Sequence, residues 1–372
     1  MCIIVREMQP SEKKAVGELF KRSLSIIDRV IFQLAFEDTQ RRARKQNGGT
    51  LIAEYDRKIV GSASMRIQVV KSKRIGFIDA LVTDREFRGR GIGRSLVDNA
   101  ITWLEKRGCE VIYATADRYN SPSWNIFIHR GFYPYELPHQ FRDYGINFLR
   151  LWFEELYFIG FGTFFLRRSK DQGKPRETGE LWHLLFALLG LSVVLWIQLL
   201  RSQGPLILIP AICVVVAFSI LTHEFIQKLA ARKLGLETTF KAWDSGILFS
   251  WFLALFGVFF PAYGSVYVRR LDWWYDPKKD RMGVVFALGP ISSSILSLTF
   301  WVISTLATDN LLIESAKIGY TISLLIAILN IIPIQTAGGF TWDGKKILTW
   351  NKVVWILLVL ATTALIVLDV IF

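Results

Sequence analysis

The clearest chemical signal is a glycine-rich loop in which Arg88, Gly91 and Gly93 form the pattern R-x-x-G-x-G. The loop follows a predicted strand at 76–84 and precedes a predicted amphipathic helix. Glycines allow neighbouring backbone N–H groups to converge on an anion, and a helix N-terminus adds positive potential. The pattern therefore favours a phosphate-binding site. The alternative interpretation is a tight strand-to-helix turn that binds nothing.

The surroundings of this loop resemble the GNAT family of N-acetyltransferases. That family binds acetyl-CoA with a Q/R-x-x-G-x-G/A loop after a strand, and here the segment reads VTDREFRGRGIG. The family also carries N-x-x-A-x-x-x-Y before a G-F pair, and this chain has NSPSWNIFIHRGF at 120–132. Asn120, Gly131 and Phe132 match, but Ser123 replaces the alanine and Phe127 stands where many members have tyrosine. The resemblance covers about residues 3–157 and implies an α+β acyltransferase fold, with a mixed sheet and flanking helices.

The resemblance also implies which residues bind acetyl-CoA and which one accepts a proton. The implied cofactor-binding residues are Val82, Arg88, Gly89, Arg90, Gly91, Ile92, Gly93, Arg94 and Asn120. The strand before the loop often carries the base that deprotonates the amine, and Asp79 has that place, although a solvated strand carboxylate is an equal alternative. Phe127 cannot protonate the departing thiolate. Tyr133, Tyr135 or His129 could replace it, although His129 is more typical of a solvated helix face.

A second set of reactive residues lies in an apolar run, where HEFIQ at 223–227 begins like the zinc-protease motif H-E-x-x-H. In that motif two histidines four residues apart bind zinc from one helix face, and the glutamate is the general base. His223 and Glu224 fall in a predicted membrane span. A charged residue there costs roughly 2.5–3.5 kcal/mol, so function is the default hypothesis.

Together with the later segment NIIPIQTAGGFTWDGKK, at 330–346, this motif resembles the site-2 protease family of intramembrane metalloproteases. That family carries N-x-x-P…D-G on a later span, and its aspartate is the third zinc ligand. The residues that fit are Asn330, Pro333, Asp343 and Gly344, with extra residues between the proline and the Asp-Gly pair. The resemblance covers about residues 181–365. It implies a metal set of His223, Gln227 and Asp343, with Glu224 as the catalytic base.

Gln227 departs from the family motif. It offers a neutral carbonyl oxygen, which is a poor zinc donor beside imidazole. His183 is the other histidine of this half that could approach the site. We therefore expect a protease fold whose zinc site is degraded and which binds transmembrane helices. The alternative is a buried polar network that holds the spans together.

Uncharged runs predict a polytopic, all-α membrane domain in the second half of the chain. The predicted spans are 181–200, 205–229, 283–307, 316–335 and 353–372, and 246–268 is predicted to be a re-entrant hairpin. No nucleic-acid motif accompanies the net charge of +13, and part of this charge lies in short loops between the predicted spans, where orientation in the membrane explains it. The basic loop at 269–281 lies inside under the re-entrant arrangement, as the positive-inside rule requires.

The predicted domains are an acetyltransferase domain at 1–157, an interfacial helix with a basic linker at 158–180, and a membrane domain at 181–372. The apolar and aromatic stretch 147–166 suggests a last strand of the first domain followed by a helix at the membrane surface. The N-terminus lacks the features of a signal peptide, so we expect a multi-pass cell-membrane protein with a cytoplasmic acetyltransferase domain.

The sequence favours a membrane-tethered enzyme that transfers acetyl from acetyl-CoA to an amine-bearing acceptor, for which a protein is one candidate. Its other expected partners are the lipid bilayer and the transmembrane helices of a client protein. One alternative is an active zinc intramembrane protease regulated by a domain that senses acetyl-CoA. The other is a non-catalytic adaptor that binds transmembrane segments.

Overall fold

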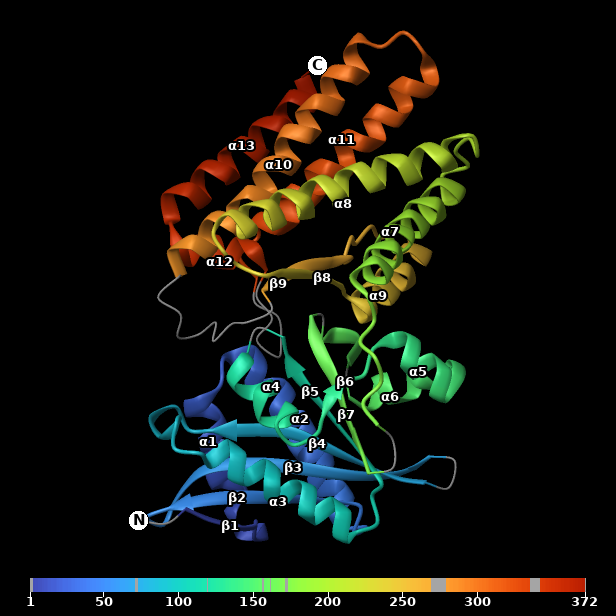
Figure 1. Cartoon of the computed structure of the whole chain (residues 1–372). Coiled ribbons are helices and arrows are strands. Elements are labelled where there is room, and N and C mark those ends of the chain that lie inside the picture. Colours follow the sequence, from blue (N-terminus) through green and yellow to red (C-terminus); the bar gives the residue numbers. More distant parts are fainter. Residues whose placement is uncertain are drawn as a thin grey trace. The chain divides into compact units, whose positions relative to one another are not determined.

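The computed structural model describes residues 3–70, 73–118, 120–155, 157–160, 162–170, 173–268, 279–334 and 342–371. The chain divides into two compact units (Figure 1). The N-terminal unit extends to Tyr157 and also includes Thr163–Glu177, and the helical unit contains Phe158–Gly162 and the described residues from Thr178 onward.

The N-terminal unit alternates strands and helices. Its strands are β1 (Ile4–Glu7), β2 (Gly48–Tyr55), β3 (Lys58–Val70), β4 (Lys73–Thr83), β5 (Val111–Asp117), β6 (Tyr133–Pro134) and β7 (Thr163–Ser169). Its α-helices are α1 (Lys13–Ser23), α2 (Ile26–Ala43), α3 (Ile92–Lys106), α4 (Ser121–Ile128), α5 (Leu137–Tyr144) and α6 (Phe148–Glu154). Short 3₁₀ turns η1 (Pro10–Glu12), η2 (Arg85–Phe87), η3 (Gly145–Asn147) and η4 (Tyr157–Ile159) connect them.

The seven strands form one mixed sheet in the order β1-β2-β3-β4-β5-β7-β6. Only the β4–β5 pair is parallel, and β2 and β3 form the predicted hairpin around Asp56 and Arg57, both at positive φ. The α3 and α4 helices cover one face, and α1 and α2 cover the other. The predicted mixed sheet with flanking helices is confirmed.

The segment between the two predicted domains folds differently from our expectation. We predicted a last strand and then an interfacial helix within 147–166, but the structure has the helix α6 first and the strand β7 afterwards. The apolar side chains of α6 are buried inside the unit, and Trp152 is fully buried. β7 pairs with β5 over its whole length, so the fold reaches Ser169 and the boundary predicted at 157 falls short of its last strand.

The helical unit begins with α7 (Glu180–Arg201) and α8 (Leu208–Lys233). The elements that follow are β8 (Thr238–Ala242), α9 (Asp244–Leu255), β9 (Gly264–Val268), α10 (Lys279–Leu306), α11 (Asn310–Ile331), α12 (Asp343–Trp350) and α13 (Lys352–Ile371). Among the described residues, four helices are long and apolar enough to cross a membrane: Glu180–Arg201, Leu208–Lys233, Met282–Leu306 and Asn310–Ile331. The predicted helical domain with several membrane-capable helices is thus confirmed. The described apolar part of α13, Lys352–Leu368, is shorter than these four.

The run 246–268 does not form one spanning helix. Within it, α9 has 12 residues, which is about 18 Å of helix against about 30 Å of bilayer core. Non-helical chain follows as far as β9, which pairs with β8 in a two-stranded sheet that the sequence did not predict. A short helix that is followed by a non-helical return is the geometry expected of a re-entrant segment. The basic loop at 269–281 was used to orient this run. Its residues 269–278 lie outside the part of the chain that the structure describes.

Candidate functional site

The glycine-rich loop has the backbone that an anion site requires. Gly89 and Gly91 have φ of +78° and +80°, and Gly91 is the N-cap of α3. A Cβ added at either residue would meet open space, so glycine is needed there for its conformation and not for packing. The first turn of a helix leaves its N–H groups without helical acceptors. These groups therefore face the loop as donors for an anion.

The side chains near the loop have different roles. Arg88 and Arg94 are exposed, but the Arg90 guanidinium lies 5.0 Å from the ring centre of Phe87. A Cβ on Gly93 would lie 3.1 Å from Ile126 Cδ1, so this glycine also allows α3 to approach α4.

The strands beside the loop separate just before it. The β4–β5 pairing ends at Ile78 and Ala114, and the register of β3 against β4 shifts between Ser62 and Ser64. Such a bulge leaves backbone groups unpaired. Val82, beyond the bulge, is buried among the α1 and α2 side chains, so only its backbone could meet a cofactor.

Asn120 and Phe127, the two residues compared with the second family motif, both have structural roles. The Asn120 side chain caps α4 by accepting from Ser123 N at 3.3 Å. Phe127 is 2% exposed and packs edge-on against Phe132, at 5.2 Å between ring centres.

The proposed substitutes for the missing tyrosine lie in different settings. The Tyr135 hydroxyl donates to Asp143 Oδ2 at 2.8 Å, and burial raises its pKa. Burial also raises the pKa of Tyr133. His129 is exposed at the end of α4.

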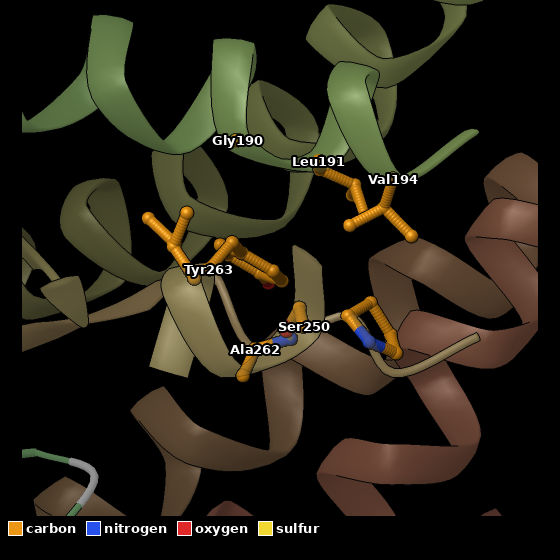
Figure 2. A pocket seen from close by; sticks show the side chains of 8 residues that line it. Gly190, Leu191, Val194, Ser250, Ala262 and Tyr263 are labelled. Carbon is orange, nitrogen blue, oxygen red and sulfur yellow. Dashed lines mark hydrogen bonds between the residues drawn. The ribbon is translucent and has the colours of Figure 1, made fainter. Parts of the chain in front are cut away.

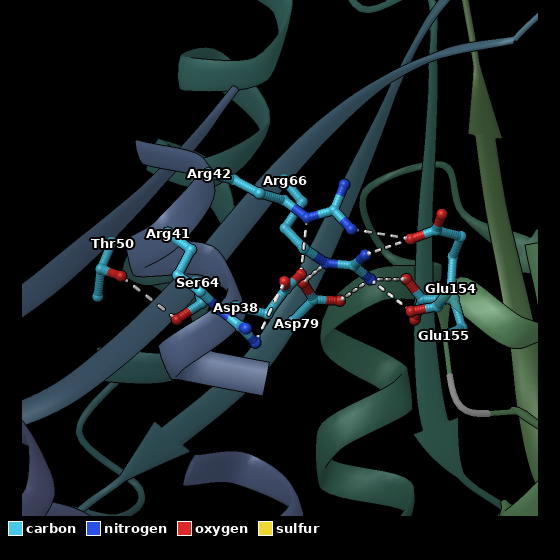
Figure 3. Close-up of polar contacts among 9 residues, drawn as sticks. All are labelled: Asp38, Arg41, Arg42, Thr50, Ser64, Arg66, Asp79, Glu154 and Glu155. Carbon is cyan, nitrogen blue, oxygen red and sulfur yellow. Dashed lines mark hydrogen bonds and ion pairs between the residues drawn. The ribbon is translucent and has the colours of Figure 1, made fainter. Parts of the chain in front are cut away.

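Asp79 lies in a buried charged cluster and not at a solvated strand surface. Arg66 donates to it twice, from Nε to Oδ2 at 2.5 Å and from the terminal nitrogen to Oδ1 at 3.1 Å. The same guanidinium donates to Glu155 at 2.9 Å and to Glu154 at 3.2 Å. Figure 3 shows Arg66 between these carboxylates, with Arg42 also bonded to Glu154. The solvated-carboxylate alternative for Asp79 is therefore wrong.

Glu155 is the functional candidate that the sequence reading missed. Its side chain is 2% exposed. Burial raises the pKa of Glu155 well above its ordinary value, and the neighbouring Asp79 carboxylate raises it further. Burial therefore favours the neutral form of the Glu155 carboxyl. Two acids inside an apolar stretch, Glu154 and Glu155, were the sequence signal that could have revealed it.

In the helical unit, α8 and α12 bring the predicted metal set together. His223, Glu224, Gln227 and Asp343 are all at most 3% exposed. Gln227 Nε2 lies 2.9 Å from Asp343 Oδ2 and 3.3 Å from His223 Nε2. The carboxylate oxygen only accepts, so the nitrogen end of the amide must face it. The other His223 nitrogen, Nδ1, contacts Ser293 Oγ at 2.8 Å.

Two glycines allow this convergence. A Cβ on Gly289 of α10 would lie 2.2 Å from Gln227 Nε2 and 2.6 Å from His223 Nε2. A Cβ on Gly344 of α12 would lie 2.0 Å from the backbone oxygen of Ile331. Glycine at position 344 therefore lets the start of α12 pack directly against the end of α11. This packing positions Asp343 within hydrogen-bond distance of Gln227 on α8.

The donors do not fit a zinc ion. One amide nitrogen already bonds both atoms that would bind the metal, His223 Nε2 and Asp343 Oδ2. The buried Lys346 ammonium donates to Asp343 Oδ1 at 2.9 Å, which places a positive charge beside a divalent cation's position. Among the described residues, no group of three His, Cys, Asp or Glu side chains could hold a metal ion. His183 Nε2 instead accepts from Lys241 at 3.1 Å.

Glu224, the predicted base, has its hydrogen-bond partner outside the predicted metal set. It accepts from the Tyr263 hydroxyl, which also receives a bond from Asn330. Tyr263 lines a tightly filled recess between α7 and the α9 region (Figure 2). Most of the recess is apolar, and Gly190, Leu191 and Val194 form its α7 side.

Comparisons with known proteins find two kinds of relative. The family model described as "Acetyltransferase (GNAT) family" matches residues 14–132. The chain is 31% identical over 135 residues to the "Putative zinc metalloprotease" of Methanocaldococcus jannaschii, covering 36% of this chain and 66% of that protein.

Solved structures also resemble the chain. One is PaiA N-acetyltransferase from Thermoplasma acidophilum in complex with coenzyme A, with 14% identity, a TM-score of 0.33 and coverage of 45% of this chain and 99% of that one. Another is glucosamine-6-phosphate N-acetyltransferase from Arabidopsis thaliana, with 20% identity, a TM-score of 0.28 and coverage of 34% and 89%. The chain thus joins an N-terminal unit that matches the GNAT acetyltransferase family model to a helical unit with four membrane-capable helices among its described residues, and the chain is also similar to a putative zinc metalloprotease.

Proposed function

We propose that this protein is a membrane-tethered N-acetyltransferase that uses acetyl-CoA. The observation that carries this proposal is the loop at Gly89 and Gly91, whose positive φ values aim backbone donors at the start of α3. The family match supports the acyltransferase class. In this proposal the loop N–H groups bind the pyrophosphate of acetyl-CoA, and the pantetheine enters where β4 and β5 separate.

The reaction is a direct transfer. The nitrogen of the amine attacks the thioester carbonyl, the carbon–sulfur bond breaks, and the acetyl group leaves CoA for the amine. The amine loses a proton, and we assign its acceptance to the Asp79–Glu155 carboxyl pair, directly or through water. Arg66 orients the pair. Phe127 offers no proton to the thiolate, so CoA leaves as a thiolate that is protonated by water or by Tyr133.

A matched pair of glycine variants at the two ends of α3 tests cofactor binding. Gly91 and Gly108 have the same φ of +80°, and neither is packed closely enough to exclude a Cβ. Gly91→Glu places a bulky acid in the loop and should abolish acetyl-CoA binding in calorimetry. Gly108→Glu carries the same backbone strain and should bind acetyl-CoA like the wild type. Equal affinity in both variants would refute the assignment.

We further propose that the helical unit has lost zinc proteolysis and that it binds transmembrane helices. The observation behind this second proposal is Gln227 Nε2, which bonds both His223 and Asp343. Its test is proteolysis of a helical substrate. Cleavage that disappears in Glu224→Gln would contradict the proposal and restore the protease interpretation. In this arrangement the acetyltransferase domain and the basic linker lie on the cytoplasmic side.

A further inference from the structure

An apolar surface of the N-terminal unit lies on α5, η3 and α6. Three large side chains protrude there: Phe141 is 58% exposed, Ile146 is 67% exposed and Phe153 is 69% exposed. They lie on three consecutive elements within thirteen residues. Single exposed apolar residues are normal on soluble domains, but a group of this kind marks an interaction surface.

The exposed charges beside these side chains are basic, although Arg142 also pairs with the partly buried Asp143 at 3.1 Å. Arg142 and Arg150 are exposed between the apolar residues. The acids of the same segment are already paired with basic side chains: Asp143 bonds Arg142, Arg167 and also Tyr135, and Glu154 bonds Arg42 and Arg66. We call Phe141, Arg142, Ile146, Arg150 and Phe153 the α5–α6 patch. Aromatic and aliphatic side chains interleaved with arginine are the composition of surfaces that bind anionic bilayers.

The covalent structure determines which partner is within reach. Ten residues separate Ser169, the end of β7, from Glu180, the start of the first membrane-capable helix. An extended chain of that length spans at most about 35 Å. A weak affinity for lipid therefore acts at the high effective concentration that a short tether provides.

We propose that the α5–α6 patch docks on the surface of a bilayer that contains anionic lipid. The three apolar side chains enter the headgroup region, and the two arginines bind lipid phosphates. The inference requires the helical unit to lie in the membrane, but it does not depend on acetyl transfer. Glu154 lies at the end of α6 and Glu155 follows it. Docking of α6 on the bilayer would therefore restrain the segment that carries these two carboxylates of the Arg66 cluster.

The test uses the full chain in nanodiscs, with an environment-sensitive dye attached at Ile146→Cys. Wild-type chain labelled in the same way gives the background of the native cysteines. In discs with phosphatidylglycerol, brominated acyl chains should lower the emission about twofold, because the dye lies at the acyl boundary. High salt should weaken this quenching, because it screens the arginines.

The control position is Leu34 on α2, which is 53% exposed but lies near the acids Asp38 and Glu37. A dye at Leu34→Cys should be quenched little. Arg142→Glu with Arg150→Glu should abolish the quenching at residue 146. Circular dichroism checks that this double variant folds. The quenching measurement does not use acetyl-CoA, so its result stands even if the protein does not bind acetyl-CoA.

Two results would overturn the proposal. One is emission at residue 146 that is the same in brominated and ordinary lipid, which would mean that protein or water covers the patch. The other is equal quenching in the double-glutamate variant, or in discs of phosphatidylcholine alone, which would remove the role of the arginines.

Discussion

Gln227 Nε2 lies 2.9 Å from Asp343 Oδ2, so the amide of α8 donates to the first residue of α12 across 116 positions of sequence. The same nitrogen reaches His223 Nε2. A neutral amide with two N–H groups thus satisfies two acceptors that a metal cation would otherwise bind. Lys346 supplies the positive charge beside Asp343. The arrangement is complete without a metal, and this has consequences for zinc content, packing and mutation.

The zinc content of the purified chain should follow position 227. We expect wild type, prepared without chelator or added metal, to contain no zinc by elemental mass spectrometry. Gln227→His supplies a second imidazole four residues from His223 and should gain zinc, and adding Lys346→Met should raise occupancy towards about one ion per chain. About one zinc per wild-type chain would mean that Gln227 is tolerated as a ligand or replaced. Failure of the double variant to bind would mean that the scaffold itself is no longer suitable.

Gly289→Ala should destabilise the helical unit. Its Cβ would lie 2.2 Å from Gln227 Nε2, so α10 must move away from α8 or the amide must leave both partners. Overpacking of this kind typically costs about 1–3 kcal/mol. Thermal unfolding is followed by thiol labelling of Cys213 on α8, in a chain whose other cysteines are replaced.

Gly17→Ala in α1 is the control for the substitution itself. Nothing lies within 4 Å of its added Cβ, so alanine should stabilise the N-terminal unit by about 0.5–1 kcal/mol. Unfolding of that unit is followed through the buried Cys109. A Gly289→Ala chain that unfolds at the wild-type temperature would contradict the close approach of α10 to Gln227.

The sequence patterns predicted the local features of the chain better than its packing. Strand alternation and the Asp56–Arg57 turn located the β2–β3 hairpin, and R-x-x-G-x-G located the start of α3, because these signals are contained in short segments. The stretch 147–166 was misread because the apolar face of α6 packs inside the sheet unit, and composition alone does not distinguish that burial from contact with lipid. The Arg66 cluster joins β3, β4 and α6, so no local pattern contains it.

The predicted metal ligands of the helical unit show the same limit of prediction from sequence. Residue types correctly placed His223, Gln227 and Asp343 together, because the two motifs define the helix faces that meet. The role of Lys346 was not predicted, because it depends on how α12 begins against α11, which Gly344 permits. The depth of His183 in the sequence pattern made it a candidate ligand, but β8 supplies Lys241 as its partner.

The stability of the N-terminal unit should fall as pH rises, because the pKa of Glu155 is raised in the folded state. Between the unfolded and folded pKa values the native state holds a proton that the unfolded chain has lost, so stability is greatest below the unfolded value. Asp79, Glu154 and Arg66 surround the group. Glu155→Gln keeps the hydrogen-bonding shape without the charge and should flatten the dependence of melting temperature on pH, measured by calorimetry.

The control for this titration is Glu86→Gln, whose side chain is 78% exposed. It should leave the slope of melting temperature against pH unchanged. If Glu155→Gln retains the wild-type slope, the folded protein does not hold a proton at this site.

Asp79→Asn separates a chemical role from a structural one in the same cluster. If the Asp79–Glu155 pair accepts the proton of the amine, the variant should lose about 10²–10⁴-fold in kcat, with acetyl-CoA affinity unchanged because the loop at Gly91 is untouched. The dependence of kcat on pH should also differ from that of the wild type. Glu154→Gln is the matched variant: it removes another carboxylate from Arg66, but Glu154 is 23% exposed and also bonds Arg42. We expect it to keep most of its activity. Equal losses in the two variants, with the same pH profile, would mean that the cluster only holds α6 to the sheet, and the base would have to be sought elsewhere.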